Sequence, residues 1–181
     1  NSNNLIKPDF YDIYDLKKEY FVLTLHRPSN VDNISVFKNI IDEIMRSTGN
    51  LKVIFPVHPR TQKNIQSIKN ISDRLICVNS LPYLEFNYLV KNSIGVITDS
   101  GGITEEATMF RVPCITMRNT TERPETVENG TNVLIGSNLE NLPKYVRKII
   151  SNKWKKSSFP EKWDGKTGPR IIKIICQVLN N

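Results

Sequence analysis

The sequence predicts an α/β fold, a doubly wound parallel sheet of Rossmann-like type. Short apolar, β-rich runs alternate with segments of helical periodicity along most of the 181 residues. This alternation favours parallel strands with helices on both faces of the sheet, joined by right-handed crossovers. The length suits one such domain, which can bury a core of its own.

The elements follow in order along the chain. Strands are expected at 20–26, 51–58, 74–78, 94–98, 113–117 and 132–136. Helices are expected at 35–49, 60–70, 83–92, 104–111, 139–151 and 169–180. The first helix places Val36, Phe37, Ile40, Ile41, Ile44 and Met45 on one face, and Gly49 supplies its C-terminal stop. Pro169 opens the last helix at a favoured position.

Residues 1–19 are polar and broken by proline, so we expect a linker or the start of an excised fragment, followed by one domain over 20–181. The net charge of +7 favours anionic partners. The basic residues are mostly spread out, and the cluster at 152–163 is expected to be a solvated loop, not a surface for nucleic acid or lipid. No apolar run approaches the roughly 20 residues of a membrane helix, and the first residues do not form a signal peptide.

Cys77, Cys114 and Cys176 all lie in apolar runs, and no C-x-x-C pair occurs. We therefore expect buried free thiols in a reducing, cytoplasmic compartment. With two histidines and scattered thiols, no metal site is expected.

Polar residues gather where the expected strands end, which is where ligands bind in such a sheet. The successive strands are followed by His26 and Arg27, by His58, by Leu81, by Asp99 to Gly102, and by Arg118 to Arg123. Cations, hydroxyls and glycines at one edge favour a phosphate-bearing ligand.

The stretch "TDSGGITEEA" is the centre of this pattern. Gly101 and Gly102 would let a phosphate approach backbone N–H groups at a helix N-terminus, and Ser100 adds a hydroxyl. Glu106 lies about one helical turn from Gly102 and can accept from a ribose diol, whereas Glu105 points roughly 100° away and is expected to be solvated.

Each of these residues also has an ordinary structural explanation. Asp99 is typical of a helix cap, the two glutamates of dipole complementation, and His26 of a structural histidine. A P-loop lysine, a G-x-G-x-x-G fingerprint and a G-x-S-x-G elbow are missing from the sequence.

The blocks "TLHRPSNVDN", "VHPR", "TDSGGITEEA", "MRNTTERPETVENGTNVLIG" and "DGKTGPRI" together resemble the UDP-N-acetylglucosamine 2-epimerases, most closely the non-hydrolysing type. The resemblance runs from about Tyr20 to the end. It implies a GT-B fold, in which two Rossmann-like domains enclose a UDP-sugar, and it covers only the second domain. We therefore expect an isolated nucleotide-binding half, inactive by itself because the catalytic carboxylates belong to the first domain.

The resemblance also implies roles for individual residues. Ser100, Gly101 and Gly102 would hold the diphosphate, Glu106 the ribose hydroxyls, Arg123 the nucleotide, and Phe86 with the backbone near Leu81 the uracil. His26 would be catalytic and support the departure of UDP. Arg27 and His58 would line the same cleft, where some bacterial members bind a second UDP-GlcNAc as activator. The family usually reads H-R-x-E-N, and this sequence has Ser29 in place of the Glu. Whether the activator site works in this protein is therefore left undecided.

The implied reaction interconverts UDP-GlcNAc and UDP-ManNAc by elimination and re-addition of UDP, with no NAD or metal cofactor. UDP-GlcNAc, UDP and the first domain are the expected partners, and the full-length protein is expected to be a homodimer. A hydrolysing 2-epimerase, a GT-B glycosyltransferase and a non-enzymatic uridine-nucleotide sensor remain alternatives.

Overall fold

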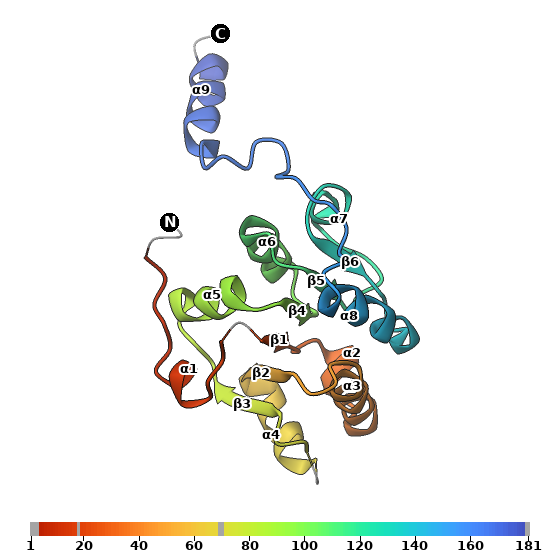
Figure 1. Ribbon diagram of the computed structural model, residues 1–181. Coiled ribbons are helices and arrows are strands. Elements are labelled where there is room, and N and C mark those ends of the chain that lie inside the picture. The colour runs from red at the N-terminus through yellow and green to blue at the C-terminus, as the bar shows by residue number, and fades with distance from the viewer. Residues whose placement is uncertain (1–3, 18, 69–70, 180–181) are drawn as a thin grey trace.

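A computed structural model describes residues 4–17, 19–68 and 71–179. Its six strands form one parallel sheet in the order β3-β2-β1-β4-β5-β6 (Figure 1). The strands are β1 (Tyr20–Thr24), β2 (Lys52–Val57), β3 (Leu75–Asn79), β4 (Gly95–Thr98), β5 (Cys114–Thr116) and β6 (Asn132–Leu134). The doubly wound, Rossmann-like sheet predicted from the sequence is confirmed.

Ten helical segments connect or flank the described strands. They are α1 (Phe10–Ile13), α2 (Pro28–Val31), α3 (Ile34–Ser47), α4 (Pro59–Ser67), α5 (Tyr83–Asn92), α6 (Gly101–Phe110), α7 (Pro124–Glu128), the 3₁₀ turn η2 (Leu139–Asn141), α8 (Leu142–Ile150) and α9 (Thr167–Leu179). Residues 69–70 of the expected helix 60–70, and residue 180 of the last expected helix, lie outside the described residues.

The alternation of side chains along β1 shows how the sheet builds a core on each face. Phe21 and Leu23 join one buried cluster, with residues of α3, α4 and α8. Tyr20 and Val22 point the other way, into a second cluster with residues of α5 and α6. Because successive strand residues face opposite sides, a strand covered on both faces has to be apolar throughout, which is what the sequence of β1 shows.

The helices differ from expectation mainly at their beginnings. α6 begins at Gly101, three residues before the expected start, because both glycines take up helical conformation behind the N-cap Ser100. α2 and α7, which were not expected, are short turns that begin with Pro28 and Pro124, residues favoured at a first helical position. α3 matches the expected face except for Val36, which is 41% exposed, and Gly49 follows it with a φ of +60°.

The segment expected to be a linker before Tyr20 packs partly on the domain. Leu16 is buried in the second core cluster, and Phe10 and Tyr11 lie against it. The proposed division at residue 20 stays a prediction; residues 1–3 and 18 lie outside the described part of the chain. Two of the three cysteines were wrongly expected to be buried: Cys77 is exposed on β3, at the edge of the sheet, and Cys176 is exposed on α9.

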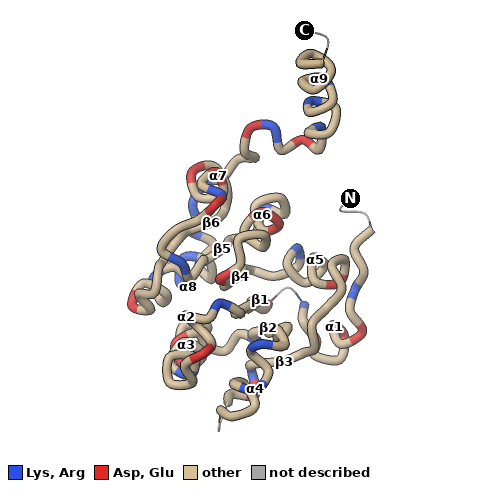
Figure 2. Tube along the Cα trace, turned by 180° about the vertical axis from the view of Figure 1, so that it is seen from behind, with Lys and Arg blue, Asp and Glu red and all other residues tan. Residues whose placement is uncertain are grey.

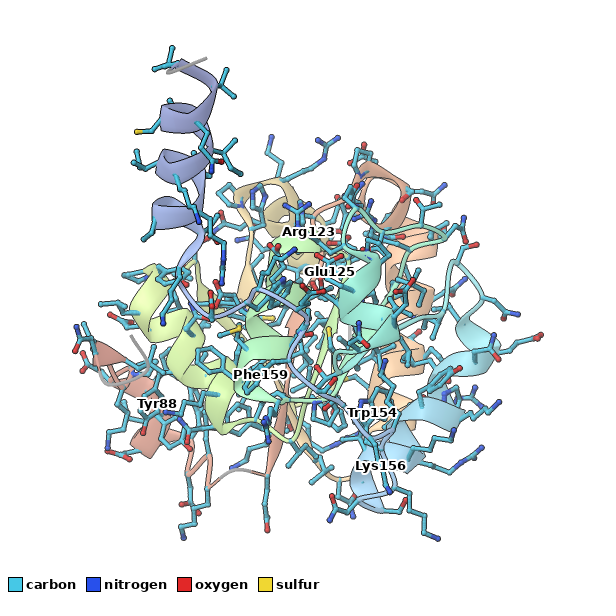
Figure 3. The ribbon with its side chains drawn as sticks, turned by 90° about the horizontal axis from the view of Figure 1, so that it is seen from above. Tyr88, Arg123, Glu125, Trp154, Lys156 and Phe159 are labelled. Atoms are coloured by element: carbon cyan, nitrogen blue, oxygen red, sulfur yellow. The ribbon has the colours of Figure 1, made fainter. Side chains whose placement is uncertain are left out.

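The basic run at 152–163 is a largely exposed loop, as expected, although two of its aromatic side chains contact the rest of the domain. Figure 3 shows Trp154, Lys156 and Phe159 along the segment that leads from α8 towards α9. The indole Nε1 of Trp154 donates to the carbonyl of Thr131 at 2.8 Å, and Arg111 lies over the ring of Phe159 at 4.5 Å. Beyond this segment α9 stands apart from the body, with none of its residues buried (Figures 1 and 2).

The strand order places a switch point between β1 and β4. The chain leaves β1 for helices on one face and leaves β4 for α6 on the other, while the two strands pair as far as Thr24 and Thr98. In sheets of this order, the crevice beyond that point is where ligands bind. Lys and Arg residues are spread over α3, α4, α8 and α9 (Figure 2), so the positive charge alone does not mark this edge.

Candidate functional site

Asp99 is the centre of the switch point. Its side chain is completely buried at the end of β4. Its carboxylate accepts from the backbone N–H of His26 at 3.1 Å, from that of Arg27 at 2.9 Å and from Nδ2 of Asn30 at 3.0 Å. Burial acts to raise the pKa of Asp99, but hydrogen bonds from His26, Arg27 and Asn30 outweigh it and hold the pKa below its ordinary value. Asp99 therefore ties the loop after β1 to the loop after β4, which corrects our expectation that it is a cap.

The imidazole of His26 is oriented by the same carboxylate. Its Nδ1 lies 2.9 Å from Oδ1 of Asp99, so Nδ1 carries the proton and Nε2 is left for a ligand. His58 lies beside it at the start of α4, with ring centroids 5.6 Å apart. Nδ1 of His58 accepts from the backbone N–H of Arg60 at 3.1 Å, which orients the second ring.

A pocket of about 290 Å³ opens next to these two imidazoles. Five of the residues singled out from the sequence line it: His26, His58, Leu81, Phe86 and Ser100. Leu81, two residues before α5, and Phe86 of its first turn supply an apolar wall, and Ile103 of α6 adds to it. An apolar wall facing imidazoles and a hydroxyl suits a planar base attached to an anionic group.

The glycine turn lies at the rim of this pocket. Ser100 is the N-cap of α6, but its hydroxyl makes no capping bond and is free to meet a ligand. A Cβ atom built on Gly102 would meet nothing within 4 Å, so the space in front of this residue is open. Neither glycine has a positive φ, since both are helical. The missing side chains leave the N–H groups of the helix N-terminus open to close approach, as an anion site would require.

Glu106 is placed differently from expectation. Its carboxylate accepts from the hydroxyl of Tyr83 at 2.6 Å, and this bond raises the pKa of the Tyr83 phenol. Both residues border a separate hollow between α5 and α6, beside the pocket that Phe86 and Ile103 line. Tyr83 is the first residue of α5, and Phe86 follows it in the same helix. Through its hydroxyl, Tyr83 links the helix that carries the residue expected to contact the uracil to Glu106, the residue expected to contact the ribose. No role was expected for Tyr83 from the sequence, although it lies between Leu81 and Phe86.

Arg123 forms an ion pair with Glu105, the residue that we expected to be solvated. Its Nε donates to Oε1 of Glu105 at 2.5 Å, which links the start of α7 to α6. Figure 3 shows Arg123 and Glu125 together at that end of α7. A second pair, Arg118 with Glu122, closes the same loop by bonds of 2.7 and 2.6 Å. The hydrogen bonds from Arg118 hold the pKa of Glu122 down at about 2.

The structure thus gathers most, but not all, of the expected residues. His26, His58, Leu81, Phe86 and Ser100 share one pocket, with Gly101 and Gly102 next to Ser100. Arg27 faces a different cavity, Glu106 a different hollow, and Arg123 is paired with Glu105. Within the described residues, no three His, Cys, Asp or Glu side chains lie together as metal ligands would.

Fold and site together define a Rossmann-like α/β domain with a glycine turn at a helix N-terminus beside its switch point. The family model for UDP-N-acetylglucosamine 2-epimerase matches residues 3–176. The chain belongs to this family, as the resemblance predicted.

Individual members of this family are similar to the chain over most of its length. The UDP-N-acetylglucosamine 2-epimerase of Methanocaldococcus jannaschii is 42% identical over 176 residues, which are 92% of this chain and 47% of the relative. A structure of the enzyme from that organism in complex with UDP-GlcNAc and UDP has a TM-score of 0.74 at 38% identity, covering 94% of this chain and 49% of the other. The S. aureus MnaA–UDP co-structure has a TM-score of 0.80 at 30% identity, covering 98% and 49%. The chain spans about half the length of the curated relatives it matches.

Proposed function

We propose that this chain is the nucleotide-sugar-binding part of an epimerase that interconverts UDP-GlcNAc and UDP-ManNAc. The observation that carries the proposal is the arrangement at the switch point. An imidazole fixed by a buried carboxylate, an open glycine turn at a helix N-terminus and an apolar wall border one pocket. Two solved relatives bind UDP, one of them with UDP-GlcNAc as well.

In the proposed complex the diphosphate lies over Ser100, Gly101 and Gly102, where backbone N–H groups and the positive end of α6 meet it. The uracil lies against Leu81 and Phe86. Glu106 accepts from the ribose hydroxyls, and Arg123 contacts the nucleotide after exchanging Glu105 for it. The Arg123–Glu105 pair is half-exposed and therefore weak, so a diphosphate can compete for the guanidinium.

His26 is the residue of this chain that we place next to the reaction. In the elimination, a base takes the proton from C2 of the sugar, the C1–O bond breaks, and UDP leaves with the bonding electron pair. Re-addition of UDP after reprotonation on the other face of C2 gives the epimer. Negative charge develops on the leaving diphosphate, and the N–H groups of the turn stabilise it there. His26 adds to this in its doubly protonated form, in which Asp99 holds Nδ1–H and Nε2–H donates to the diphosphate. The base for C2 is not among the residues of this site.

Two measurements test the proposed function, one of UDP binding and one of product formation from UDP-GlcNAc. The 181-residue chain should bind UDP but should form no product from UDP-GlcNAc, because it spans only half the length of its relatives. A protein of the relatives' full length that contains this sequence should form UDP-ManNAc, which ¹H NMR of the sugar distinguishes from UDP-GlcNAc. Release of free ManNAc would contradict the proposed reversible reaction and support the hydrolysing alternative. Product formation by the 181-residue chain alone would contradict the division of labour.

Three further expectations stay predictions: that the full-length protein is a homodimer, that it works in the cytoplasm, and that Arg27 and His58 take part in binding a second UDP-GlcNAc. Ser29 is 2 residues from Arg27 and stands where the family usually has a glutamate. No helix in the described part of the chain is long and apolar enough to cross a membrane.

A further inference from the structure

The glycine turn before α6 is only half open in the free chain. A Cβ atom built on Gly102 would meet nothing within 4 Å, whereas one built on Gly101 would lie 3.3 Å from Oε2 of Glu122. A carboxylate oxygen therefore occupies the space in front of Gly101, the first residue of α6. The proposed function places a diphosphate over this turn and gives Glu122 no role.

Arg118 holds the Glu122 carboxylate in that place. Its Nη1 donates to Oε2 of Glu122 at 2.7 Å and its Nη2 donates to Oε1 at 2.6 Å. A guanidinium forms the same two-point pair with a phosphate group. Nη1 of Arg118 would itself lie 3.5 Å from a Cβ atom on Gly101, so the guanidinium also lies close to the turn.

The Glu122 carboxylate carries its charge at neutral pH. Hydrogen bonds from Arg118, with a further contribution from the charge of Arg27, hold the pKa of Glu122 down at about 2. A diphosphate over Gly101 would therefore meet a second anion at close range, and the repulsion between the two anions would oppose binding. The carboxylate has to leave before a phosphate can lie over Gly101.

The exposure of the two side chains decides which of them can move. The Arg118 side chain is 8% exposed, and the Glu122 side chain is 61% exposed. The backbone carbonyl of Arg118 accepts from the N–H of Gly136 at 3.0 Å, which ties the loop after β5 to the loop after β6. Glu122 lies in the loop that leads to α7, and its carboxylate can turn into water, where its charge is solvated. Arg118 therefore stays at the turn when the carboxylate leaves.

A carboxylate at an anion site also has a structural reason. A nearly buried guanidinium without a partner is costly, so Arg118 needs a counter-charge when no ligand is bound. An exposed acidic side chain supplies this charge and is held weakly enough to be exchanged. Arg123, the next residue in the chain, is paired in the same way with Glu105, and the proposed function has it exchange that partner for the nucleotide.

We propose that Glu122 is an internal stand-in for the phosphate of the ligand. It fills the space over Gly101 in the free chain, and the arriving diphosphate displaces it and takes its place beside Arg118. Glu122 therefore competes with every phosphate-bearing ligand at this turn while it keeps the Arg118 guanidinium in position. This inference rests on the proposed function, because it takes the position of the diphosphate from it.

Glu122→Gln tests this competition on the 181-residue chain. Calorimetry measures the affinities for UDP and for pyrophosphate, and an NMR titration measures the affinity for uridine, which has no phosphate. The variant keeps an acceptor for Arg118 and loses the charge, so it should bind UDP and pyrophosphate about threefold to tenfold more tightly than the wild type and bind uridine equally well. Glu128→Gln removes the same charge from an exposed residue at the end of α7 and should alter none of the three affinities.

A second readout follows the guanidinium itself. UDP should shift the side-chain Nε–H signal of Arg118 in the ¹⁵N-labelled wild-type chain, because the partner of the guanidinium changes from a carboxylate to a phosphate. An Arg118 signal that UDP does not shift would contradict the exchange.

Unchanged or weaker binding of UDP by Glu122→Gln would show that the carboxylate supports the site and does not compete for it, which would overturn this inference while the nucleotide site stands. An equal gain for uridine would also overturn it, because the effect would then not depend on the phosphate. If the wild-type chain binds no UDP at the switch point, the proposed function itself fails.

Discussion

Nδ1 of His26 lies 2.9 Å from Oδ1 of Asp99, and the side chain of Asp99 is completely buried while that of His26 is 40% exposed. One carboxylate therefore fixes a ring that faces solvent and also receives the backbone N–H groups of His26 and Arg27. Because β1 and β4 carry these two loops, the bond joins the strands at the switch point. Stability and site geometry depend here on the same residue.

Asp99→Asn should lower the free energy of unfolding by about 1–3 kcal/mol, because an amide offers one acceptor and places an N–H among donors that then lack a buried partner. Urea denaturation measures the loss. Asp32→Asn is a matched control, since Asp32 also accepts from an arginine, Arg60, but on the surface. A loss at Asp99 no greater than that at Asp32 would contradict the central role of the buried carboxylate.

The same carboxylate predicts a dependence on pH. The pKa of Asp99 is held below its ordinary value of 3.8, so its contribution to stability is complete above that pH and is lost as the pH falls through the lower pKa of the folded state. The difference in unfolding free energy between the wild type and Asp99→Asn should therefore be constant near neutrality and shrink in acid. A difference that grows on acidification would mean that Asp99 is protonated in the folded protein.

Gly102→Ala should separate folding from binding. Alanine is favoured over glycine in a helix by up to about 1 kcal/mol, and a Cβ atom at 102 meets no protein atom. The variant should be as stable as the wild type or more so, yet bind UDP severalfold more weakly, because its methyl group occupies the open space in front of the helix N-terminus. Gly168→Ala, also at the second position of a helix with nothing nearby, should leave UDP affinity unchanged. Unaltered UDP binding by Gly102→Ala would remove the turn from the site.

Glu106→Gln tests recognition of the ribose. It should weaken UDP by about 1–3 kcal/mol, the range for hydrogen bonds to a charged group, and should affect 2′,3′-dideoxy-UDP much less. Tyr83→Phe should also weaken binding of UDP more than binding of 2′,3′-dideoxy-UDP, but by less than Glu106→Gln. It removes the 2.6 Å hydrogen bond that holds the Glu106 carboxylate in place, and the carboxylate oxygens that would accept from the ribose remain. Glu105→Gln is no clean control, since Glu105 pairs with Arg123. Exposed Glu128 serves instead. An effect that is the same for both ligands would contradict recognition of the diol, and tighter binding of both would mean that Glu106 only complements the dipole of α6.

The sequence predicted the sheet well because the strands are buried on both faces and the helices are periodic. It also located the ends of β1 to β4, whose polar residues form the pocket. It could not show that the carboxylate of Asp99 accepts hydrogen bonds from the loop after β1, because that loop reaches Asp99 only through the pairing of β1 with β4. The partners of Glu105 and Glu106 were also missed, because contacts between separate elements of the fold cannot be read from local sequence. Arg123 reaches Glu105 from the start of α7, and Tyr83 reaches Glu106 from α5. Short helices that start at proline, such as α2, have too few residues to show periodicity.

The most direct test of the account is a titration of the ¹⁵N-labelled 181-residue chain with UDP, followed by amide chemical shifts. The account predicts saturable shifts centred on residues 100–106, with further shifts at His26, Leu81, Phe86 and Arg123. Residues of α8, none of which lines this pocket, should respond little. Shifts confined to Lys153–Lys156 would show attraction of an anion to basic side chains alone and would contradict a nucleotide site at the switch point.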